Sequence, residues 1–393
     1  MSNFNYIESL LELNDFIVTK INNSFNVTQV SVELPVKPHV CPCCNTITSK
    51  IHDYRIQSIK DIPIYKKKTL INYRKRRYVC PNCLKKFYEI NDFVAHYQHK
   101  SSRLNMWIVQ ELRNVQSLKE IANYLHVSTP TISRILNTIS PTHPSSLPTV
   151  IALDEFKGDA STGKYQCIFT DPSARKTLDI LPVRNESRLR EYFRKFPLEQ
   201  RNNVEYAVID MWRPYAQLIS QLFPKAKIII DRFHYVRQVI WALENTRKRI
   251  QNTLSKDDRL HFKRSKKLLL MNSYKIIDAD NWRLRRMFII KPELEKAYDL
   301  KENFYWLLES KSREEARERL FIWYKEVESC NIPEFKSAYR AIKNWEKYIL
   351  NSFEVPYSNG YTEGTNNKIK VIKRNAFGLR NFERMRTRIL LNT

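Results

Sequence analysis

Three short apolar runs, each followed at once by an aspartate, constrain the fold of this chain most strongly. The runs are residues 150–153, 206–209 and 227–230, and the acids that follow them are Asp154, Asp210 and Asp231. Continuous runs rich in β-branched residues are typical of strands buried on both faces of a parallel sheet. Ligand sites of such sheets lie at the carboxyl ends of the strands. We therefore expect the three acids at one edge of a sheet.

The segments between these runs predict a single topology. Two further strands, over residues 165–171 and 177–183, follow the first run, and residues 171–175 carry the signals of a hairpin turn. Helices are expected over 186–196, over 213–222 and from Tyr235 onward. The resulting order, βββαβαβα, is that of the ribonuclease-H-like fold. In that fold the first and fourth strands are neighbours, which would bring Asp154 and Asp210 together.

A third carboxylate is expected from a late helix beside these strands. Glu363, in the segment SNGYTEGTNNKIKVIKRN, is the best candidate. At helical spacing it shares a polar face with Asn366, Lys370 and either Lys373 or Arg374. A carboxylate flanked by amide and basic groups can bind a metal ion and hold a DNA backbone at the same time. The alternative is a solvated surface glutamate.

The N-terminal third contains a predicted zinc site. Cys41 with Cys44 and Cys80 with Cys83 form two CxxC pairs, which together complete a closed tetrahedral Zn²⁺ shell. A shell of four thiolates leaves no open position, so the role of the ion is structural. Cys43 instead of Cys44 is an open alternative, as is a set of unligated buried thiols. Residues 53–64 and 69–79 are expected as the arms of a hairpin, and the basic stretch 66–78 either contacts phosphates or forms a solvated edge strand.

Residues 117–136 carry the signals of a helix-turn-helix. Ser117 and Glu120 form a capping box that opens the first helix. Thr129 is expected to cap the second helix, with Pro130 at its first position. A generic helical hairpin is the alternative. The side chains expected to face the major groove of DNA are those of Thr131, Ser133, Arg134 and Asn137.

The composition favours a nucleic acid as partner and excludes several other classes of protein. The formal net charge of +26 points to a polyanion. No run of some 18 apolar residues and no signal peptide is evident, so a membrane is not expected as the partner. With only five glycines there is no Walker loop and no GxGxxG motif, which argues against nucleotide-driven motors and dinucleotide enzymes. The odd count of seven cysteines suits a metal site in a reducing, cytoplasmic setting.

Asp210 and Glu363 are separated by a long segment that shows helical patterns only. Roughly residues 247–347 lack strand signals, and we interpret them as an all-helical insertion in the core. The insertion contains four tryptophans, for which stacking on an unpaired base is one interpretation and core packing the other. They are Trp282, Trp306, Trp323 and Trp345.

Taken together, these motifs resemble the IS-L-three family of bacterial insertion-sequence transposases. The resemblance rests on the CPxC pairs, the helix-turn-helix, LDEF, VIDMWRPY, IIIDRFHYVRQ and SNGYTEGTNNKIKVIKR, and it extends over essentially the whole chain. It implies a DDE triad of Asp154, Asp210 and Glu363. Asp231 and His234 also match a family motif, and we expect them to support the triad without binding metal themselves. An acid that only caps the following helix is the alternative for Asp231.

The resemblance implies two-metal cleavage and joining of DNA strands. Asp154 would bridge two Mg²⁺ (or Mn²⁺) ions, with Asp210 and Glu363 each binding one. Asn366, Lys370, Lys373 and Arg374 would contact DNA. The expected partners are terminal inverted repeats and target DNA, and since DNA ends must be paired, we expect a homo-oligomer in the cytoplasm at the nucleoid. The rival functions are a DNA-binding regulator without catalysis and a nuclease that never joins strands.

The expected domain organisation follows from these assignments. It comprises a zinc-binding domain (1–95), a helix-turn-helix (96–140), a linker (141–148), the first part of the catalytic core (149–246), the helical insertion (247–347) and the C-terminal part of the core (348–393).

Overall fold

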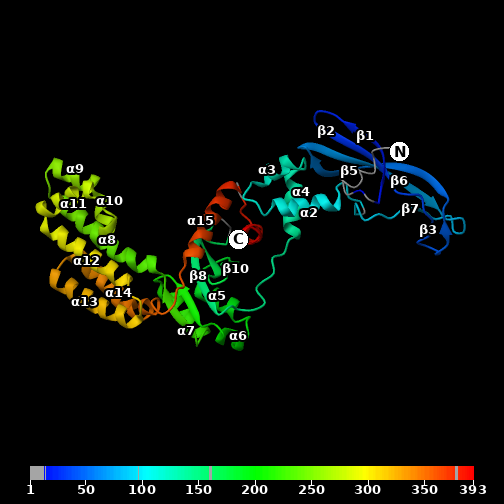
Figure 1. Cartoon of the computed structure of the whole chain (residues 1–393). Helices are drawn as coiled ribbons and strands as arrows, with labels where there is room; N and C mark the ends of the chain where they lie inside the picture. Colours follow the sequence, from blue (N-terminus) through cyan, green and yellow to red (C-terminus); the bar gives the residue numbers. More distant parts are fainter. Residues whose placement is uncertain (1–12, 14, 96, 159–161, 377–378) are drawn as a thin grey trace. The chain divides into compact units, whose positions relative to one another are not determined.

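The computed structural model describes residues 13, 15–95, 97–158, 162–376 and 379–393 (Figure 1). Its contacts separate the chain into two units, one of Met1–Pro141 with Lys370–Asn392 and one consisting essentially of Thr142–Ile369. The linker expected at 141–148 is irregular, as its prolines predict. The sequence assigned residues 348–393 to the core, whereas in the structure residues 370–392 group with the N-terminal part of the chain.

A mixed five-stranded sheet lies in the N-terminal part of the first unit. Its order is β1-β2-β6-β5, with β7 also paired to β6. The hairpin arms predicted from the sequence are confirmed as the antiparallel pair β5 and β6, whereas the edge-strand interpretation of residues 66–78 is wrong, because β6 lies between β2 and β5. The strands of this unit are β1 (Ile17–Asn23), β2 (Val27–Glu33), β3 (His39–Val40), β4 (Ile47–Thr48), β5 (Ile51–Ile64), β6 (Lys67–Val79) and β7 (Lys86–Tyr88).

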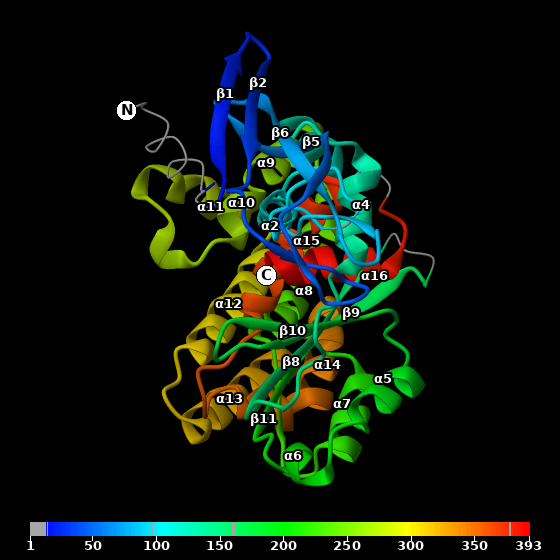
Figure 2. The ribbon, with the colours of Figure 1, turned by 90° about the vertical axis from the view of Figure 1, so that its right-hand side faces the viewer.

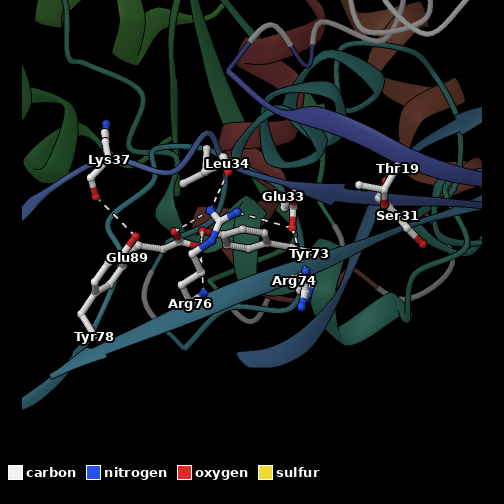
Figure 3. Close-up of polar contacts among 10 residues, drawn as sticks. All are labelled: Thr19, Ser31, Glu33, Leu34, Lys37, Tyr73, Arg74, Arg76, Tyr78 and Glu89. Atoms are coloured by element: carbon white, nitrogen blue, oxygen red, sulfur yellow. Dashed lines mark hydrogen bonds and ion pairs between the residues drawn. The ribbon is translucent and has the colours of Figure 1, made fainter. Parts of the chain in front are cut away.

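The central position of β6 turns part of its basic stretch inward. The Arg76 guanidinium is buried, where it donates to the Leu34 carbonyl at 2.5 Å and lies 3.4 Å from the Glu89 carboxylate (Figure 3). The Tyr73 hydroxyl donates to the same carboxylate at 2.6 Å. A buried charge is tolerated only when it is paired and hydrogen-bonded. Arg76 therefore stabilises the sheet and is not available to DNA.

Three helices follow the sheet: α2 (Ser102–Glu111), α3 (Leu118–Tyr124) and α4 (Thr129–Thr138). The predicted capping box is confirmed, with the backbone N–H of Glu120 donating to Ser117 Oγ and that of Ser117 donating to Glu120. The sequence suggested Thr129 as the N-cap of α4, but the N-cap in the structure is Ser128. His126 in the turn has φ of 51°, a conformation that glycine adopts more readily.

A C-terminal helix, α16 (Phe382–Asn392), packs in this same unit. The guanidinium of Arg388 is buried and donates to the carbonyls of Asn114 at 2.8 Å and Gln116 at 2.6 Å, and also to that of Leu112. These carbonyls belong to the residues that directly follow α2. Backbone groups at the end of a helix have no partner within the helix and need donors from elsewhere. The helix-turn-helix is thus completed by residues from the far end of the chain.

The second unit is built on a five-stranded sheet of order β10-β9-β8-β11-β12 (Figure 2). The strands are β8 (Val150–Lys157), β9 (Tyr165–Asp171), β10 (Lys176–Leu181), β11 (Tyr206–Ile209) and β12 (Lys227–Ile230). β8, β9 and β10 are antiparallel neighbours, while β11 runs parallel to both β8 and β12. All five predicted strands are present, and β8 and β11 are adjacent as expected.

Alternate residues of the central strands face two separate apolar layers. Ile151, Ile209 and Ile230 belong to the large core formed with α5 (Glu186–Phe193) and α7 (Arg213–Leu222), whereas Ala152 and Val208 face the segment that contains Val355. A short helix, α6 (Leu198–Asn202), was not predicted. With both faces covered, the carboxyl edge of the strands is the part left open for polar groups.

Residues 247–347, all of which the structure describes, consist of helices and the loops between them, without a strand. They begin within α8 (Arg232–Gln251), which leads from the carboxyl edge of the sheet into the insertion (Figure 1). The others are α9 (Lys256–Arg264), α10 (Lys266–Leu270), the 3-10 helix η1 (Ser273–Lys275), α11 (Asp278–Ile290), α12 (Pro292–Leu308), α13 (Arg313–Cys330) and α14 (Pro333–Asn351). Of the four tryptophans, Trp323 and Trp345 are buried, while Trp282 and Trp306 are exposed. The helix α15 (Gly360–Asn375) follows α14 and precedes α16.

Candidate active site and zinc centre

Parallel pairing places the predicted acids at one edge of the second sheet. Val208 of β11 pairs with Ala152 of β8, and Ile209 pairs with Ile230 of β12. Asp154, Asp210 and Asp231 follow these pairs by one or two residues. The register therefore accounts for the gathering of the three carboxylates. Asp210 and Asp231 follow their strands as predicted, whereas Asp154 lies within β8, which continues to Lys157.

Asp231 is buried and fully used by backbone donors. Its carboxylate accepts from the N–H of Phe233 at 3.1 Å, which caps α8, and from the N–H of Asn359 at 2.9 Å. The cap that the sequence offered as the alternative role of Asp231 is therefore present. The contact with Asn359 is additional, and it ties the residue before α15 to the carboxyl end of β12.

His234 joins Asp210 to the first turn of α8. Its Nε2 lies 2.9 Å from Oδ1 of Asp210, and the same oxygen lies 3.4 Å from the side-chain nitrogen of Asn359. Burial alone would lower the pKa of His234, but the hydrogen bond and the negative charge of Asp210 outweigh it and raise that pKa. This contact fixes the orientation of the Asp210 carboxylate against the first turn of α8.

Glu363 enters the site from the first turn of α15. The N-terminal end of this helix is fixed on the sheet, because the Thr362 hydroxyl lies 2.8 Å from that of Thr170 on β9. The Glu363 N–H donates to the Asn359 carbonyl at 2.8 Å. Glu363 thus reaches the edge where Asp210 and Asp231 lie, and burial together with these two negative charges raises its pKa.

Asn366 links α15 to Asp154. Its side-chain nitrogen donates to Oδ2 of Asp154 at 2.7 Å, and the other carboxylate oxygen accepts from the Glu155 N–H at 2.6 Å. Because Asn366 follows Glu363 by three residues, both side chains lie on one face of the helix. Burial, with the nearby charge of Asp210, raises the pKa of Asp154 to about 7.

The polar groups at this edge do not all converge on one point. Ligand atoms of Asp231, His234 and Glu363 lie within 4.8 Å of one another, and among the described residues neither Asp154 nor Asp210 belongs to that group. The side chain of His234 connects Asp210 to this group. Asp154 lies close enough to Asp210 for the negative charge of Asp210 to raise its pKa. The side-chain oxygens of Asn359 and Asn366 are buried and accept no hydrogen bond. The edge thus combines crowded carboxylates with unused amide oxygens, a donor set that suits a hard divalent cation.

Four cysteines of the first unit form a second, separate cluster. The Sγ atoms of Cys41, Cys44, Cys80 and Cys83 all lie within 4.8 Å of one another, with Cys41 3.5 Å from Cys83 and Cys44 3.4 Å from Cys80. A tetrahedral ion with Zn–S bonds of about 2.3 Å would separate its sulfurs by roughly 3.8 Å. Cys43 is exposed and lies outside the cluster.

The two CxxC turns have the same backbone geometry. The N–H of Cys41 donates to the Thr46 carbonyl at 2.9 Å, as that of Cys80 donates to Lys85 at 3.0 Å. The fifth residue of each turn has a positive φ, 57° at Asn45 and 59° at Leu84. Hydrogen bonds with Thr46 lower the pKa of Cys44 to about 6, which favours the thiolate that binds metal.

Comparison with known proteins places the chain in a family. A model of a transposase family, ISL3, matches residues 151–389, more than half of the sequence. The chain belongs to the ISL3 family of transposases. Residues 37–83 match the zinc finger of the transposases of IS204, IS1001, IS1096 and IS1165, and residues 89–140 match the helix-turn-helix domain of the ISL3 family. The resemblance drawn from the sequence is thus confirmed, and the protein is a DNA transposase.

Individual relatives agree with this assignment. This ISL3 transposase is 27% identical over 359 residues to the transposase of insertion sequence element IS1001 from Bordetella parapertussis, covering 88% of this chain and 87% of the relative. It is 22% identical to the IS1557 transposase of Mycobacterium tuberculosis over 55% of this chain and 54% of the relative. A protein of Lactococcus lactis named an ATP-dependent protease is 33% identical over only 25% of this chain and 31% of its own length.

The side chains expected to contact DNA differ in their surroundings. In the helix-turn-helix of this ISL3 transposase, Arg134 is exposed while Thr131 and Ser133 are half-buried. Asn137 is exposed, but its side-chain oxygen accepts from Nε of Arg384 in α16 at 2.7 Å. On α15, Lys370 and Arg374 are exposed and Lys373 is half-buried.

Asn359 is the site residue that the sequence analysis missed. Its backbone contacts Asp231 and its side chain contacts Asp210, although nothing in the sequence assigned it a role in the site. An asparagine directly before the helix that carries Glu363 was the available clue. Within the described residues, no helix of this transposase is both long and apolar enough to span a lipid bilayer.

Proposed function

We propose that this ISL3 transposase cuts and joins DNA as a DDE enzyme, with Asp154, Asp210 and Glu363 as its essential carboxylates. The observation that supports this most directly is that two neighbouring strands, β8 with Asp154 and β11 followed by Asp210, meet the first turn of α15, which carries Glu363. Asp210 lies close enough to both other acids to raise their pKa values. Mutual repulsion of this kind costs stability unless a cation relieves it.

The catalytic core is proposed to be ribonuclease-H-like. Three antiparallel strands followed by two parallel strands, in the order β10-β9-β8-β11-β12, support this fold. The helices α5 and α7 occur at the expected places between the strands. The all-helical segment would then be an insertion between the last strand of the core and the helix that carries Glu363.

Divalent ions, Mg²⁺ or Mn²⁺, fit the residues at this edge. The three carboxylates would hold a pair of ions, and the unpartnered oxygens of Asn359 and Asn366 add neutral donors beside them. Bound ions would neutralise charge at the attacking and leaving oxygens of an in-line displacement. His234 and Asp231 are proposed as positioning residues. His234 orients Asp210, while Asp231 fixes Asn359 at the start of α15.

The reaction would proceed in two successive displacement reactions at phosphorus. Water attacks at the end of the element and the bond from phosphorus to the 3′ oxygen breaks, which frees a 3′-hydroxyl and leaves a 5′-phosphate. That hydroxyl then attacks a phosphate of target DNA, and the 3′ oxygen of the target leaves. No protein nucleophile is required. Lys370, Lys373 and Arg374 would hold the backbone through their charges.

The remaining parts would recognise and organise the DNA. One structural Zn²⁺ on Cys41, Cys44, Cys80 and Cys83 would stabilise the first unit, and the helix-turn-helix would read the terminal inverted repeats through Thr131, Ser133, Arg134 and Asn137. Because two ends must be cut together, we propose that the protein acts as a homo-oligomer on paired ends, at the nucleoid in the cytoplasm.

The proposal is tested with the full-length protein and a duplex that carries a terminal repeat. Asp154→Ala, Asp210→Ala and Glu363→Ala should each abolish Mg²⁺-dependent cleavage while leaving binding of the repeat unchanged. Retained cleavage in one variant removes that residue from the triad. If the unaltered protein binds but never cleaves, it is the non-catalytic regulator, and if it cleaves without strand transfer, it is a nuclease.

A further inference from the structure

One exposed face of α8 combines two aromatic rings and an arginine beside the candidate active site. Phe233, Arg237 and Trp241 are spaced at four-residue intervals, so they lie on the same side of the helix. The side chains of Phe233 and Trp241 are 53% and 48% exposed. The guanidinium carbon of Arg237 lies 5.3 Å from the centre of the Phe233 ring and 4.5 Å from that of Trp241. We call these three side chains the α8 ladder.

The α8 ladder begins at the acidic edge. Phe233 packs edge-on against His234, with ring centres 5.7 Å apart, and His234 contacts Asp210. Phe233 also donates its N–H to Asp231. The positive charge of Arg237 reaches the site as well, since it opposes the rise in the pKa of Glu363. Any ligand on the ladder would therefore adjoin the group held at the carboxylates.

Arg237 is not neutralised by the protein. Nowhere in the described part of the chain does it form an ion pair, although Glu363 lies near, and its Nε is buried without a hydrogen-bond partner. An arginine held between two open ring faces provides positive charge and a flat stacking surface together. The exposed ring surfaces of Phe233 and Trp241 are therefore accessible to another flat group that can pack against them.

We propose that the α8 ladder binds unpaired nucleotides next to the scissile phosphate, an inference that rests on the proposed DNA cleavage at the carboxylates. Bases inside a duplex already stack on each other, so only unpaired bases can present their faces to Phe233 and Trp241. Eight helical residues span about 12 Å, which matches roughly three nucleotides at 3.4 Å each. The chemistry selects a single strand and not a particular sequence, because every base has a π-face.

The test separates stacking from charge by using two oligonucleotides with the same number of phosphates. One is a fluorescein-labelled oligothymidylate and the other its abasic counterpart, and binding to the full-length protein is measured by anisotropy without divalent ions. Stacking of one base contributes about 1–3 kcal/mol, so the unaltered protein should prefer the oligothymidylate by about 5- to 150-fold. Phe233→Ala and Trp241→Ala should each lose most of this preference, while Trp241→Phe should retain it in part.

Trp306→Ala is the matched control. Trp306 is 43% exposed and has the guanidinium of Arg319 4.1 Å from its ring centre, but it lies in α12, outside the α8 ladder. This variant should keep the full preference. An unchanged preference in Phe233→Ala and Trp241→Ala, or an equal loss in Trp306→Ala, would overturn the inference. Because the assay needs no cleavage, its failure is distinct from a failure of the proposed DDE reaction.

Discussion

The Asn366 side chain connects Asp154 to the helix carrying Glu363. Its hydrogen bond of 2.7 Å fixes one carboxylate oxygen, while the Glu155 N–H fixes the other. Burial and the charge of Asp210 both disfavour the ionised form of Asp154, so a donor aimed at its carboxylate favours the form that binds cations.

Asn366→Ala should therefore slow cleavage without preventing DNA binding. A hydrogen bond to a charged group contributes about 1.5–3 kcal/mol, which corresponds to a loss of about 10- to 150-fold in rate. The measurement is single-turnover cleavage of a terminal-repeat duplex. Asn344→Ala, at an exposed position on α14, is the control and should cleave normally. A cleavage rate for Asn366→Ala equal to that of the control would show that this hydrogen bond is dispensable.

The neighbouring cysteines Cys43 and Cys44 offer a second comparison at residue scale. Cys44→Ser should lose the bound zinc and unfold the two CxxC turns, because a closed site needs all four thiolates. Cys43→Ser should keep one zinc ion per chain, since Cys43 lies outside the cluster. Metal content of the purified proteins, together with thermal unfolding, distinguishes the two variants. Equal zinc content in both would contradict this choice of ligand.

Sequence reasoning located the residues with distinctive local signals and missed those defined by long-range contacts. Strand ends marked Asp154 and Asp210, and the CxxC spacing marked the cysteines. Asn359 has no such local signal. The residues that it contacts, Asp210 and Asp231, lie far from it in the sequence, about half of the second unit away. Likewise, a helical cap can be read from neighbouring residues, but the further bond from Asp231 to α15 cannot.

Among the secondary-structure elements, β6 and α16 differ most from expectation. The edge-strand interpretation of β6 failed because its parallel partner, β2, lies some forty residues earlier and has no turn signal connecting the two. The helix α16 has ordinary amphipathic spacing, which says nothing about the unit it joins. Arg388 is one of many basic residues in the sequence, yet it is buried and donates to carbonyls that follow α2.

Replacing Arg388 should disrupt the helix-turn-helix even though the residue faces no DNA. Arg388→Ala removes the hydrogen bonds to the carbonyls of Leu112, Asn114 and Gln116, of which Leu112 still accepts from Asn392 and Asn114 from the Gln116 N–H. We expect a loss of about 3 kcal/mol in stability. Repeat binding should weaken in parallel with thermal unfolding of the first unit. Arg380→Ala, at an exposed position, is the control. Normal stability of Arg388→Ala would mean that α16 is not needed for this fold.

At the scale of the whole molecule, the basic residues behind the net charge of +26 serve different purposes. Some basic side chains are used inside the fold, as Arg76 and Arg388 are. Others lie exposed on α15 close to Glu363 in sequence, where the proposed reaction requires a phosphate backbone. Composition alone predicted a polyanionic partner, but it could not divide the charges between these two uses.

The salt dependence of DNA binding measures how many of these charges contact phosphates. Replacing Lys370, Lys373 and Arg374 together by alanine should reduce the slope of log K against log salt by about 0.9 for each lost contact, or about 2.7 in total. The control removes three exposed charges from the helical insertion, those of Lys256, Arg285 and Lys296, and should leave the slope unchanged. Equal slopes for the two triple variants would indicate that α15 does not follow the backbone.

The placement of α16 has a consequence for how the protein is made. Since α16 supplies Arg388 to the carbonyls that follow α2, a ribosome must translate all three proposed catalytic carboxylates before the helix-turn-helix can be completed. A nascent or prematurely terminated chain would hold the helix-turn-helix residues without the helix that completes them. Chains truncated by nonsense mutations should then bind the transposon ends poorly. The ends would be bound mainly by chains that already contain the three proposed catalytic carboxylates.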